Sequence, residues 1–378
     1  MPPRLAVLAP FCVAAALLWA ALVFAAPPGM TTLQIGQPAP DFELPGVDGK
    51  TYSQADFDDA KVLAVIFTCN HCPTAQAYED RIIKLHEEYK DRGVAVVAIS
   101  PNDPKAVRLD ELGYTDVGDS LEDMKLRAEE QGFEFPYLYD GETQKTSAAY
   151  GVLATPHVFI FDAGRKLRYV GRVDDSDVGN VRSHDARNAI DTLLAGRPVP
   201  VERTRVFGCS TKWSDKRQSV IDSLKRWDAE PVTLETIDPD DVKKLAENKT
   251  GKLLLVNLWA TWCGPCVEEL PELVTINRMY RRRPFELVTI GLNDVSEKEQ
   301  ALKFLKDRHV STRNYLFTST DRDKLAEALD PEWPGPLPYT LLIAPGGKVI
   351  YRHHGPLEPL EVRRAIVEYL GRTYAGRR

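Results

Sequence analysis

Two stretches of the chain repeat the same order of apolar runs and amphipathic segments. In the first stretch, the β-branched apolar run 61–67 predicts a buried strand, and apolar positions three or four residues apart predict a helix that ends near residue 92. Residues 93–100 form a second buried-strand pattern, followed by a turn-rich insertion over 101–118. The remaining predicted elements are a helix over 121–131, an extended piece at 137–139, strands at 157–161 and 167–173, and a helix over 185–195.

The second stretch predicts strands at 252–259, 285–292, 341–344 and 349–352, and helices at 263–281, 297–308 and 358–370. Strands that alternate with helices and end in a hairpin and a helix indicate an α/β fold. We therefore expect two domains of duplicated architecture, over residues 30–200 and 232–378, joined by a linker over 201–231. A hairpin over residues 30–57 is expected to cap the first domain.

Residues 1–26 form a third kind of segment. Arg4 precedes an uncharged apolar run over 5–26, and small residues follow where a signal peptidase would cut. The pattern predicts export to the periplasm, with an uncleaved membrane anchor as the alternative.

Composition narrows the class of function. The chain has 378 residues, 43% hydrophobic and 27% charged, which suits two globular domains. The formal charge of −7 argues against a nucleic-acid partner, because such proteins need Lys and Arg to replace phosphate counterions. Six cysteines are too few for a fold of this length to be stabilised mainly by disulfide bonds. Four of them fall in two Cys-x-x-Cys pairs.

The two pairs, Cys69/Cys72 and Cys263/Cys266, each follow a predicted strand and open a predicted helix. A helix N-terminus favours a thiolate on the first cysteine, and a second cysteine one turn later resolves the mixed disulfide. We therefore expect Cys69 and Cys263 to attack and Cys72 and Cys266 to resolve.

Each half also has a proline directly before its later strand, in Thr155-Pro156 and Leu337-Pro338. In a thioredoxin fold Pro156 and Pro338 would be cis and lie beside the reactive sulfur. Trp262 is interpreted as support around the second site. No cofactor or resident metal is predicted.

Residues from about 232 to 370 resemble the TlpA/ResA-like periplasmic thioredoxins. The similarity rests on the run Val256 to Cys266, on Glu269-Leu-Pro271, and on Leu337-Pro-Tyr-Thr340. Asn257 stands where cytoplasmic thioredoxins have a buried acid, and the resemblance implies that Glu269 serves instead, by exchanging a proton with Cys266. An ordinary first-turn glutamate is the alternative.

Residues from about 33 to 213 resemble a peroxiredoxin-like branch of the AhpC/TSA thioredoxin-fold proteins. The matching pieces are 67–73, 135–140, 171–175 and 208–213. Peroxidatic cysteines of that family follow a hydroxyl residue by three positions, and neither Cys69 nor Cys72 does, which argues against peroxidase activity. His71 matches the histidine of the oxidising Cys-Pro-His-Cys motif of DsbA. The odd cysteine, Cys209, is a candidate resolving partner of Cys69, a metal ligand together with Cys69 and Cys72, a partner for a cysteine of another chain, or a plain connector residue.

Together these features predict an α/β protein of two thioredoxin-like domains in tandem, each a central mixed sheet flanked by helices. The expected function is thiol–disulfide exchange with partner proteins, supported by a membrane-bound electron donor, with roles in redox homeostasis and antioxidant defence. Electrons would pass from the second pair to the first, across a gap of about 150 mV, or roughly 7 kcal/mol. The alternatives are a thiol peroxidase recycled by its own thioredoxin domain, and a metal- or haem-handling module that uses Cys69, His71, Cys72 and Cys209.

Overall fold

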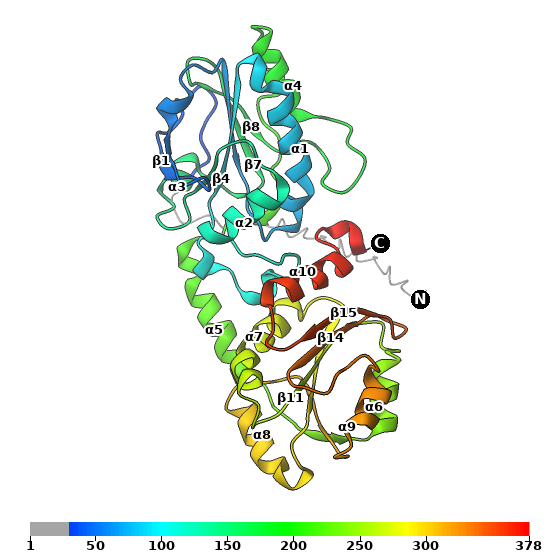
Figure 1. The fold of residues 1–378 in the computed structure, drawn as a ribbon. Helices are drawn as coiled ribbons and strands as arrows, with labels where there is room; N and C mark the ends of the chain where they lie inside the picture. Colours follow the sequence, from blue (N-terminus) through cyan, green and yellow to red (C-terminus); the bar gives the residue numbers. More distant parts are fainter. Residues whose placement is uncertain (1–29, 378) are drawn as a thin grey trace, which may run out of the picture.

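The fold was analysed in a computed structural model, which describes residues 30–377. The first domain is built on a sheet with the strand order β5-β4-β3-β7-β8 (Figure 1). Central β3 pairs in parallel with β4 and antiparallel with β7. The strand bounds are Val62–Phe67 for β3, Val94–Ser100 for β4, Tyr137–Tyr139 for β5, His157–Phe161 for β7 and Leu167–Gly171 for β8.

Both faces of this sheet are covered, which explains why β3 reads as a continuous apolar run. Alternate residues such as Ala64 and Ile66 pack under three helices on one face, whereas Val65 and Phe67 pack under the N-terminal segment and a short helix on the other. The helices are α1 (Pro73–Tyr89), α2 (Leu121–Gln131) and α4 (Asp185–Leu194) on the first face, and α3 (Lys145–Tyr150) on the second. The hairpin β1 (Glu43–Pro45) and β2 (Thr51–Ser53) confirms the predicted N-terminal cap.

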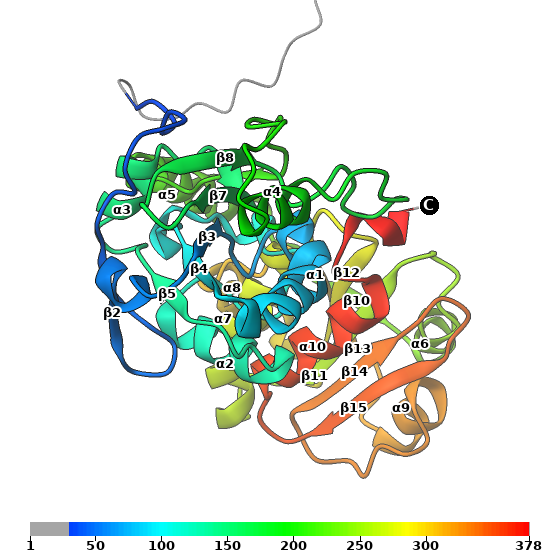
Figure 2. The ribbon, with the colours of Figure 1, turned by 90° about the horizontal axis from the view of Figure 1, so that it is seen from above.

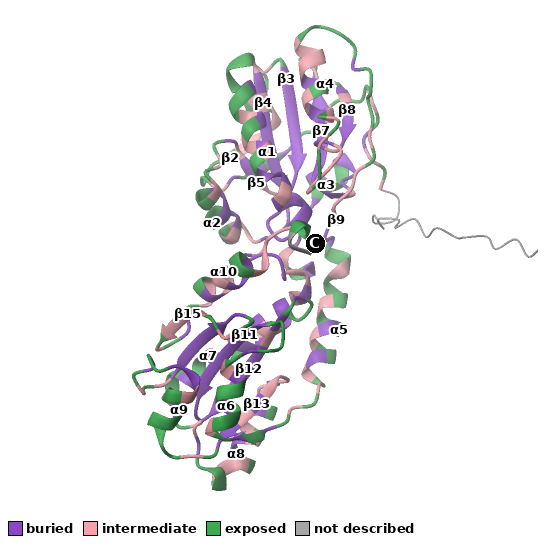
Figure 3. Ribbon diagram, turned by 90° about the vertical axis from the view of Figure 1, so that its right-hand side faces the viewer, coloured by how far each residue is buried: buried purple, intermediate pink, exposed green. Residues whose placement is uncertain are grey.

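The second domain has the strand order β10-β13-β12-β11-β14-β15. Its strands are β10 (Glu235–Ile237), β11 (Leu253–Trp259), β12 (Phe285–Gly291), β13 (Arg313–Phe317), β14 (Tyr339–Ile343) and β15 (Val349–His354). Helices α7 (Gly264–Tyr280), α8 (Lys298–Lys306) and α10 (Pro359–Leu370) cover one face, and α6 (Pro239–Ala246) and α9 (Arg322–Leu329) the other. In both domains the central strands are buried and the helices expose their outer sides, whereas the edge strands β10 and β15 are partly exposed (Figure 3). The predicted fold class and the duplication are confirmed.

The segment 201–231, expected to be a linker, is only partly one. The short strand β9 (Cys209–Ser210) pairs antiparallel with β6 (Ala154–Thr155) of the first domain, and Trp213 is buried in that domain's core. Only α5 (Arg217–Asp228) runs from the first domain to the second (Figure 1). Residues 201–213 are held to the first domain mainly by backbone hydrogen bonds. Such pairing does not require apolar side chains at regular intervals, so the sequence of this segment shows no core periodicity.

The two domains meet through the turn-rich insertion that follows β4. Arg283 of the second domain donates to the Gly113 carbonyl at 2.6 Å and lies over the Tyr114 ring, 3.9 Å from its centroid. The Tyr280 hydroxyl donates to the Thr115 carbonyl at 2.9 Å. Arg372 and the buried Asp116 form a two-point ion pair, with bonds of 2.5 and 2.9 Å. These buried, charge-assisted contacts fix the insertion to the second domain.

A second line of contact comes from α10, which lies beside α2 of the first domain (Figures 1 and 2). Here Arg364 forms an ion pair with Glu130. The contacts of Tyr280 and Arg283 belong to the C-terminal end of α7. The first domain therefore meets the second at the end of α7 opposite to Cys263.

Residues 1–29 and 378 lie outside the described residues, so the predicted leader and Cys12 lie outside them too. Within residues 30–377 no helix is both long and apolar enough to cross a bilayer.

The interface predicts the effect of Arg283→Ala. The change removes the guanidinium that donates to the carbonyls of Gly113 and Gly371. It should lower the free energy of unfolding by roughly 2–3 kcal/mol. The radius of gyration from X-ray scattering should rise as the domains separate. Arg226→Ala, on the exposed side of α5, is the control and should change neither quantity. An unaltered scattering profile for Arg283→Ala would contradict this account of the interface.

Candidate redox sites at two strand-to-helix turns

The second site lies where β11 turns into α7. Cys263 is the N-cap of α7, and its Sγ accepts a hydrogen bond of 3.3 Å from the backbone N–H of Cys266. The two cysteines form a disulfide. Both sulfur-bearing residues are nearly buried, but the neighbouring Trp262 is 57% exposed. An exposed aromatic side chain next to a reactive sulfur offers apolar contact to a partner protein.

The cis proline of each domain lies beside its redox turn. The peptide bonds Thr155-Pro156 and Leu337-Pro338 are both cis, as expected for the fold. Pro338 precedes Tyr339, which pairs with Leu258 at the end of β11, and Pro156 precedes His157, which pairs with Phe67 at the end of β3.

Glu269 is buried in the second turn of α7. One carboxylate oxygen accepts from the Asn257 side chain and the other from the backbone N–H of Leu357, each at 2.8 Å. Burial raises the pKa of Glu269, although both hydrogen bonds favour its charged form. Glu269 therefore joins β11, α7 and the segment before α10, and its proton exchange with Cys266 stays a prediction.

The first site has a different register from the one that its motif predicts. Cys72, not Cys69, is the N-cap of α1, and its Sγ accepts a 3.4 Å hydrogen bond from the Ala75 N–H. Because Phe67 and Leu258 hold equivalent places against the strand after the cis proline, Cys72 corresponds to Cys263. The second cysteine of the second site then corresponds to Ala75, which carries no thiol.

This register corrects the expectation that Cys69 lies at the N-terminus of the helix, on which its predicted attacking role rested. Cys69 lies before the helix begins, where no free helical N–H groups point, and its Sγ is 3.0 Å from the Thr155 hydroxyl. Burial raises the pKa of Cys69 well above its usual range.

The environment of Cys72 favours its thiolate. Burial by itself would raise the pKa of Cys72, but hydrogen bonds from the Cys209 and Cys69 thiols outweigh it. The positive charge of His71 and the N–H of Ala75 act in the same direction. The pKa of Cys72 consequently lies well below the usual value of a thiol, whereas its hydrogen bond to Cys72 raises the pKa of Cys209.

His71 is buried and paired with Asp119, a residue that sequence reasoning missed. The His71 Nδ1 lies 2.5 Å from one Asp119 oxygen, while the other oxygen accepts from the backbone N–H groups of Asn70 and His71 at 2.9 and 3.1 Å. Burial disfavours the imidazolium, but the Asp119 charge and hydrogen bond prevail, so the pKa of His71 is raised. Asp119 is one of several acidic residues in and after the insertion, so nothing in the sequence singled it out.

Cys69, His71 and Asp119 also bring a thiol, an imidazole and a carboxylate within 4.8 Å of one another. This ligand set is one that Zn²⁺ accepts. The His71 Nδ1 is already bonded to Asp119, and among the described residues its Nε2 has no hydrogen-bond partner.

The two redox sites are not brought together within the chain. Helix α7 has 17 residues, so Cys263 lies about 25 Å along its axis from the interdomain contact at Tyr280. The insertion over 101–118, by contrast, begins at the carboxyl end of β4. Because β4 is parallel to β3, this end lies on the same side of the sheet as Cys72. Thiol–disulfide exchange needs the sulfurs in bonding contact. In this arrangement the expected relay from the second pair to the first does not run within one molecule.

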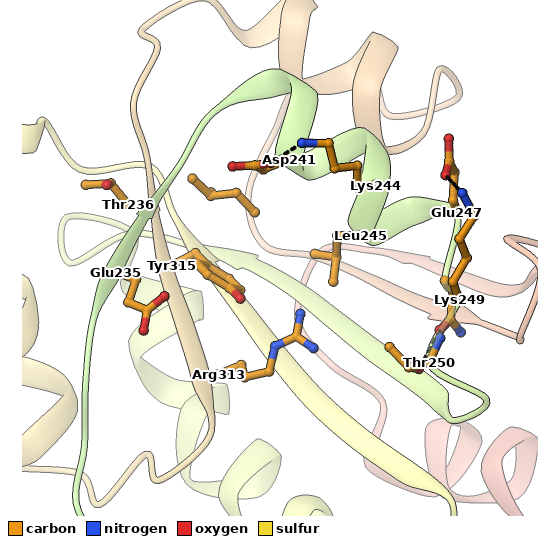
Figure 4. A pocket seen from close by; sticks show the side chains of 12 residues that line it. Glu235, Thr236, Asp241, Lys244, Leu245, Glu247, Lys249, Thr250, Arg313 and Tyr315 are labelled. Atoms are coloured by element: carbon orange, nitrogen blue, oxygen red, sulfur yellow. Dashed lines mark hydrogen bonds and ion pairs between the residues drawn. The ribbon is translucent and has the colours of Figure 1, made fainter.

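A cavity of about 620 Å³ lies at the far edge of the second sheet, beside β10 and β13. Figure 4 shows Arg313 and Tyr315 next to it, together with the ion pairs Asp241–Lys244 and Glu247–Lys249. No cysteine lines this cavity, so it adds nothing to the redox sites.

Comparisons with known proteins agree with this architecture. The fold and the two turns define a tandem thioredoxin-fold protein. More specifically, residues 35–170 match the model of the AhpC/TSA family, and residues 228–367 match the Redoxin model.

Among curated relatives, the thiol-disulfide oxidoreductase ResA of Bacillus subtilis is 33% identical over 100 residues, which cover 26% of this chain and 51% of ResA. The chain thus spans about half the length of the ResA proteins that it matches. The thiol:disulfide interchange protein HelX of Rhodobacter capsulatus is 24% identical over 187 residues, 49% of this chain and 82% of HelX.

Among solved structures, an uncharacterized conserved protein from Geobacillus kaustophilus is 39% identical, with a TM-score of 0.44. The match covers 49% of this chain and 95% of that one.

The charge on His71 predicts a shift in the Cys72 titration. His71→Gln removes a positive neighbour that lowers the pKa of Cys72, so this pKa should rise. The thiolate would then disappear at a higher pH than in the parent protein. Ultraviolet absorbance of the thiolate, with the Cys72→Ser signal subtracted, measures this. His184→Gln on an exposed loop is the matched control, and equal Cys72 titrations in both variants would contradict the role of His71.

Proposed function

We propose that this protein catalyses thiol–disulfide exchange, with Cys263 and Cys72 as the attacking thiols of two independent sites. The observation that carries the proposal is that each of these cysteines is the N-cap of the helix after the central strand and accepts a backbone N–H on its sulfur. Free N–H groups and the helix dipole at that position stabilise a thiolate. The names of the ResA and HelX relatives support the same reaction class.

The second site is the one suited to protein disulfides. The Cys263 thiolate attacks a partner disulfide, one partner sulfur leaves as a thiol, and Cys266 then displaces the other by forming the disulfide that the structure contains. Trp262 provides the exposed apolar contact beside this sulfur. Asn257, Glu269 and Pro338 shape the turn and its support.

The cellular setting forms part of the proposal. An apolar leader over residues 5–26 and the likeness to ResA support work outside the cytoplasm, where thiols must be kept reduced by an external donor. A membrane-bound dithiol donor would restore the Cys263 and Cys266 thiols. Transfer between the two sites then takes place between molecules.

The trapping of partners tests this function. Cys266→Ser should hold a protein substrate such as insulin as a mixed disulfide on Cys263, because the resolving thiol is gone. Cys263→Ser should reduce insulin in the presence of dithiothreitol no faster than the uncatalysed reaction. The double variant is the control for adventitious capture. Wild-type turnover by Cys263→Ser would refute the assignment of Cys263.

A second candidate function for the first domain is reduction of peroxides. Cys72 is completely buried yet has a lowered pKa, which suits an oxidant small enough to reach a covered thiolate. Its neighbours Pro73 and Thr74 are buried as well. In the place of the missing hydroxyl residue, Thr155 presents a hydroxyl to Cys69.

Consumption of hydrogen peroxide distinguishes this candidate. With dithiothreitol as donor, a peroxidase would lose its activity in Cys72→Ser and keep most of it in Cys69→Ser, because only Cys72 has the helix N-terminus. Equal consumption by the two variants and by a heat-unfolded sample would exclude a dedicated peroxidase.

A further inference from the structure

A strand of the chain itself lies across the first redox site. β9 runs antiparallel to β6, with Cys209 opposite Thr155 and Ser210 opposite Ala154. The pairing continues from the Thr211 N–H to the Leu153 carbonyl at 3.3 Å. Cys209 is therefore held directly beside the residue that precedes the cis proline.

Two features on either side fix this strand. Gly208 has φ +145°, and a Cβ at this position would lie 2.0 Å from the Thr155 carbonyl oxygen, so only glycine permits the approach. On the other side, the Lys212 backbone N–H donates to Asn102 at 2.8 Å and its ammonium pairs with Glu111 at 2.6 Å. The position of Cys209 is thus built into the fold.

Three thiols meet at this point. Cys69, Cys72 and Ala75 form a buried cluster, and Cys209 packs against it. Of the three cysteines, Cys209 is the one that retains partial contact with solvent.

The first domain lacks a resolving cysteine at the usual helical position. In the second site, Cys266 lies one turn into α7 and closes the disulfide with Cys263. The equivalent place in α1 is Ala75, so the partner of Cys72 must come from elsewhere. Cys69 is buried and engaged with the Thr155 hydroxyl, and a disulfide closed with it would bury both sulfurs.

We propose that Cys72 and Cys209 form the redox-active disulfide of the first domain, and that Cys209 is the sulfur through which partner dithiols exchange with it. The inference rests on the proposed function, to which it adds the cysteine that pairs with Cys72 in the first domain. Cys69 is then a positioning residue that donates a hydrogen bond to Cys72.

The exchange step balances without a further reactant. A thiolate of the partner dithiol attacks the partly exposed Cys209 sulfur, the Cys72–Cys209 bond breaks, and Cys72 leaves as a thiolate. The second thiolate of the partner attacks the mixed disulfide and releases Cys209, which takes up a proton. The partner dithiol is oxidised to a disulfide, and the two cysteines are reduced. A stabilised leaving thiolate makes this site an oxidant of its partner.

Peptide mapping of the full chain tests the pairing. The protein is equilibrated in graded reduced and oxidised glutathione, alkylated, and digested under non-reducing conditions. We expect a peptide linking Cys72 to Cys209 to appear as the buffer becomes oxidising, both in the parent chain and in Cys69→Ser. It should be absent from Cys209→Ser, while the Cys263–Cys266 transition stays unchanged in all variants as an internal reference.

Two further variants separate the thiol from the strand. Gly208→Ala pushes β9 away from Thr155 without removing a cysteine, and should require more oxidising buffer to form the Cys72–Cys209 peptide. Ser210→Ala, next to Cys209 on the same strand, is the matched control and should titrate like the parent chain.

Several outcomes would overturn the inference. These are a Cys69–Cys72 peptide in the oxidised parent chain, a Cys209–Cys209 dimer on non-reducing gels, or stoichiometric zinc that Cys209→Ser releases. If instead neither Cys72 nor Cys263 forms any disulfide in these buffers, the proposed exchange function itself fails, so the two failures are distinguishable.

Discussion

One buried carboxylate, that of Asp119, holds the first redox turn in place. It accepts hydrogen bonds from the backbone of Asn70 and His71, from the His71 ring and, at 2.8 Å, from the Asn102 amide. A buried anion is stable only when such donors are present, so the turn, the imidazole and the start of the insertion are fixed together. The same insertion carries Gly113, Tyr114 and Asp116 to the second domain. The Asp119 carboxylate and the insertion that it anchors therefore fix both the geometry around Cys72 and the docking of the two domains.

The two sites show how one framework yields different chemistry. Each begins at a helix N-cap beside a cis proline, yet the second cysteine is one turn into the helix at Cys266 and before the helix at Cys69. The second turn also stands beside an exposed tryptophan, whereas the first is covered by β9. Small changes in where a thiol stands along a turn thus decide which sulfurs pair and which molecules reach them.

Much of this arrangement was predictable from the sequence. The strands β3 and β11 are apolar throughout because both their faces are buried, and the helices after them show the expected periodicity. Cys69 was expected to open the helix, because the two motifs were aligned on their first cysteine, whereas the N-cap is Cys72. The correct alignment follows from the pairing of Phe67 and Leu258 with the residue after each cis proline, and the sequence alone does not show that pairing. The sequence singled out Cys209 as an odd thiol, but neither its place beside Cys72 nor the role of Asp119 could be predicted, because contacts across 137 and 48 residues leave no local pattern.

The orientation of α7 has a consequence for the energetics of the whole chain. A rigid helix of about 25 Å separates Cys263 from the contact with the first domain, so the effective concentration of one site at the other is close to zero. Two redox sites on one flexible chain could exchange electrons with each other directly. Here the docked interface holds the two turns apart, so that direct exchange within one molecule is prevented.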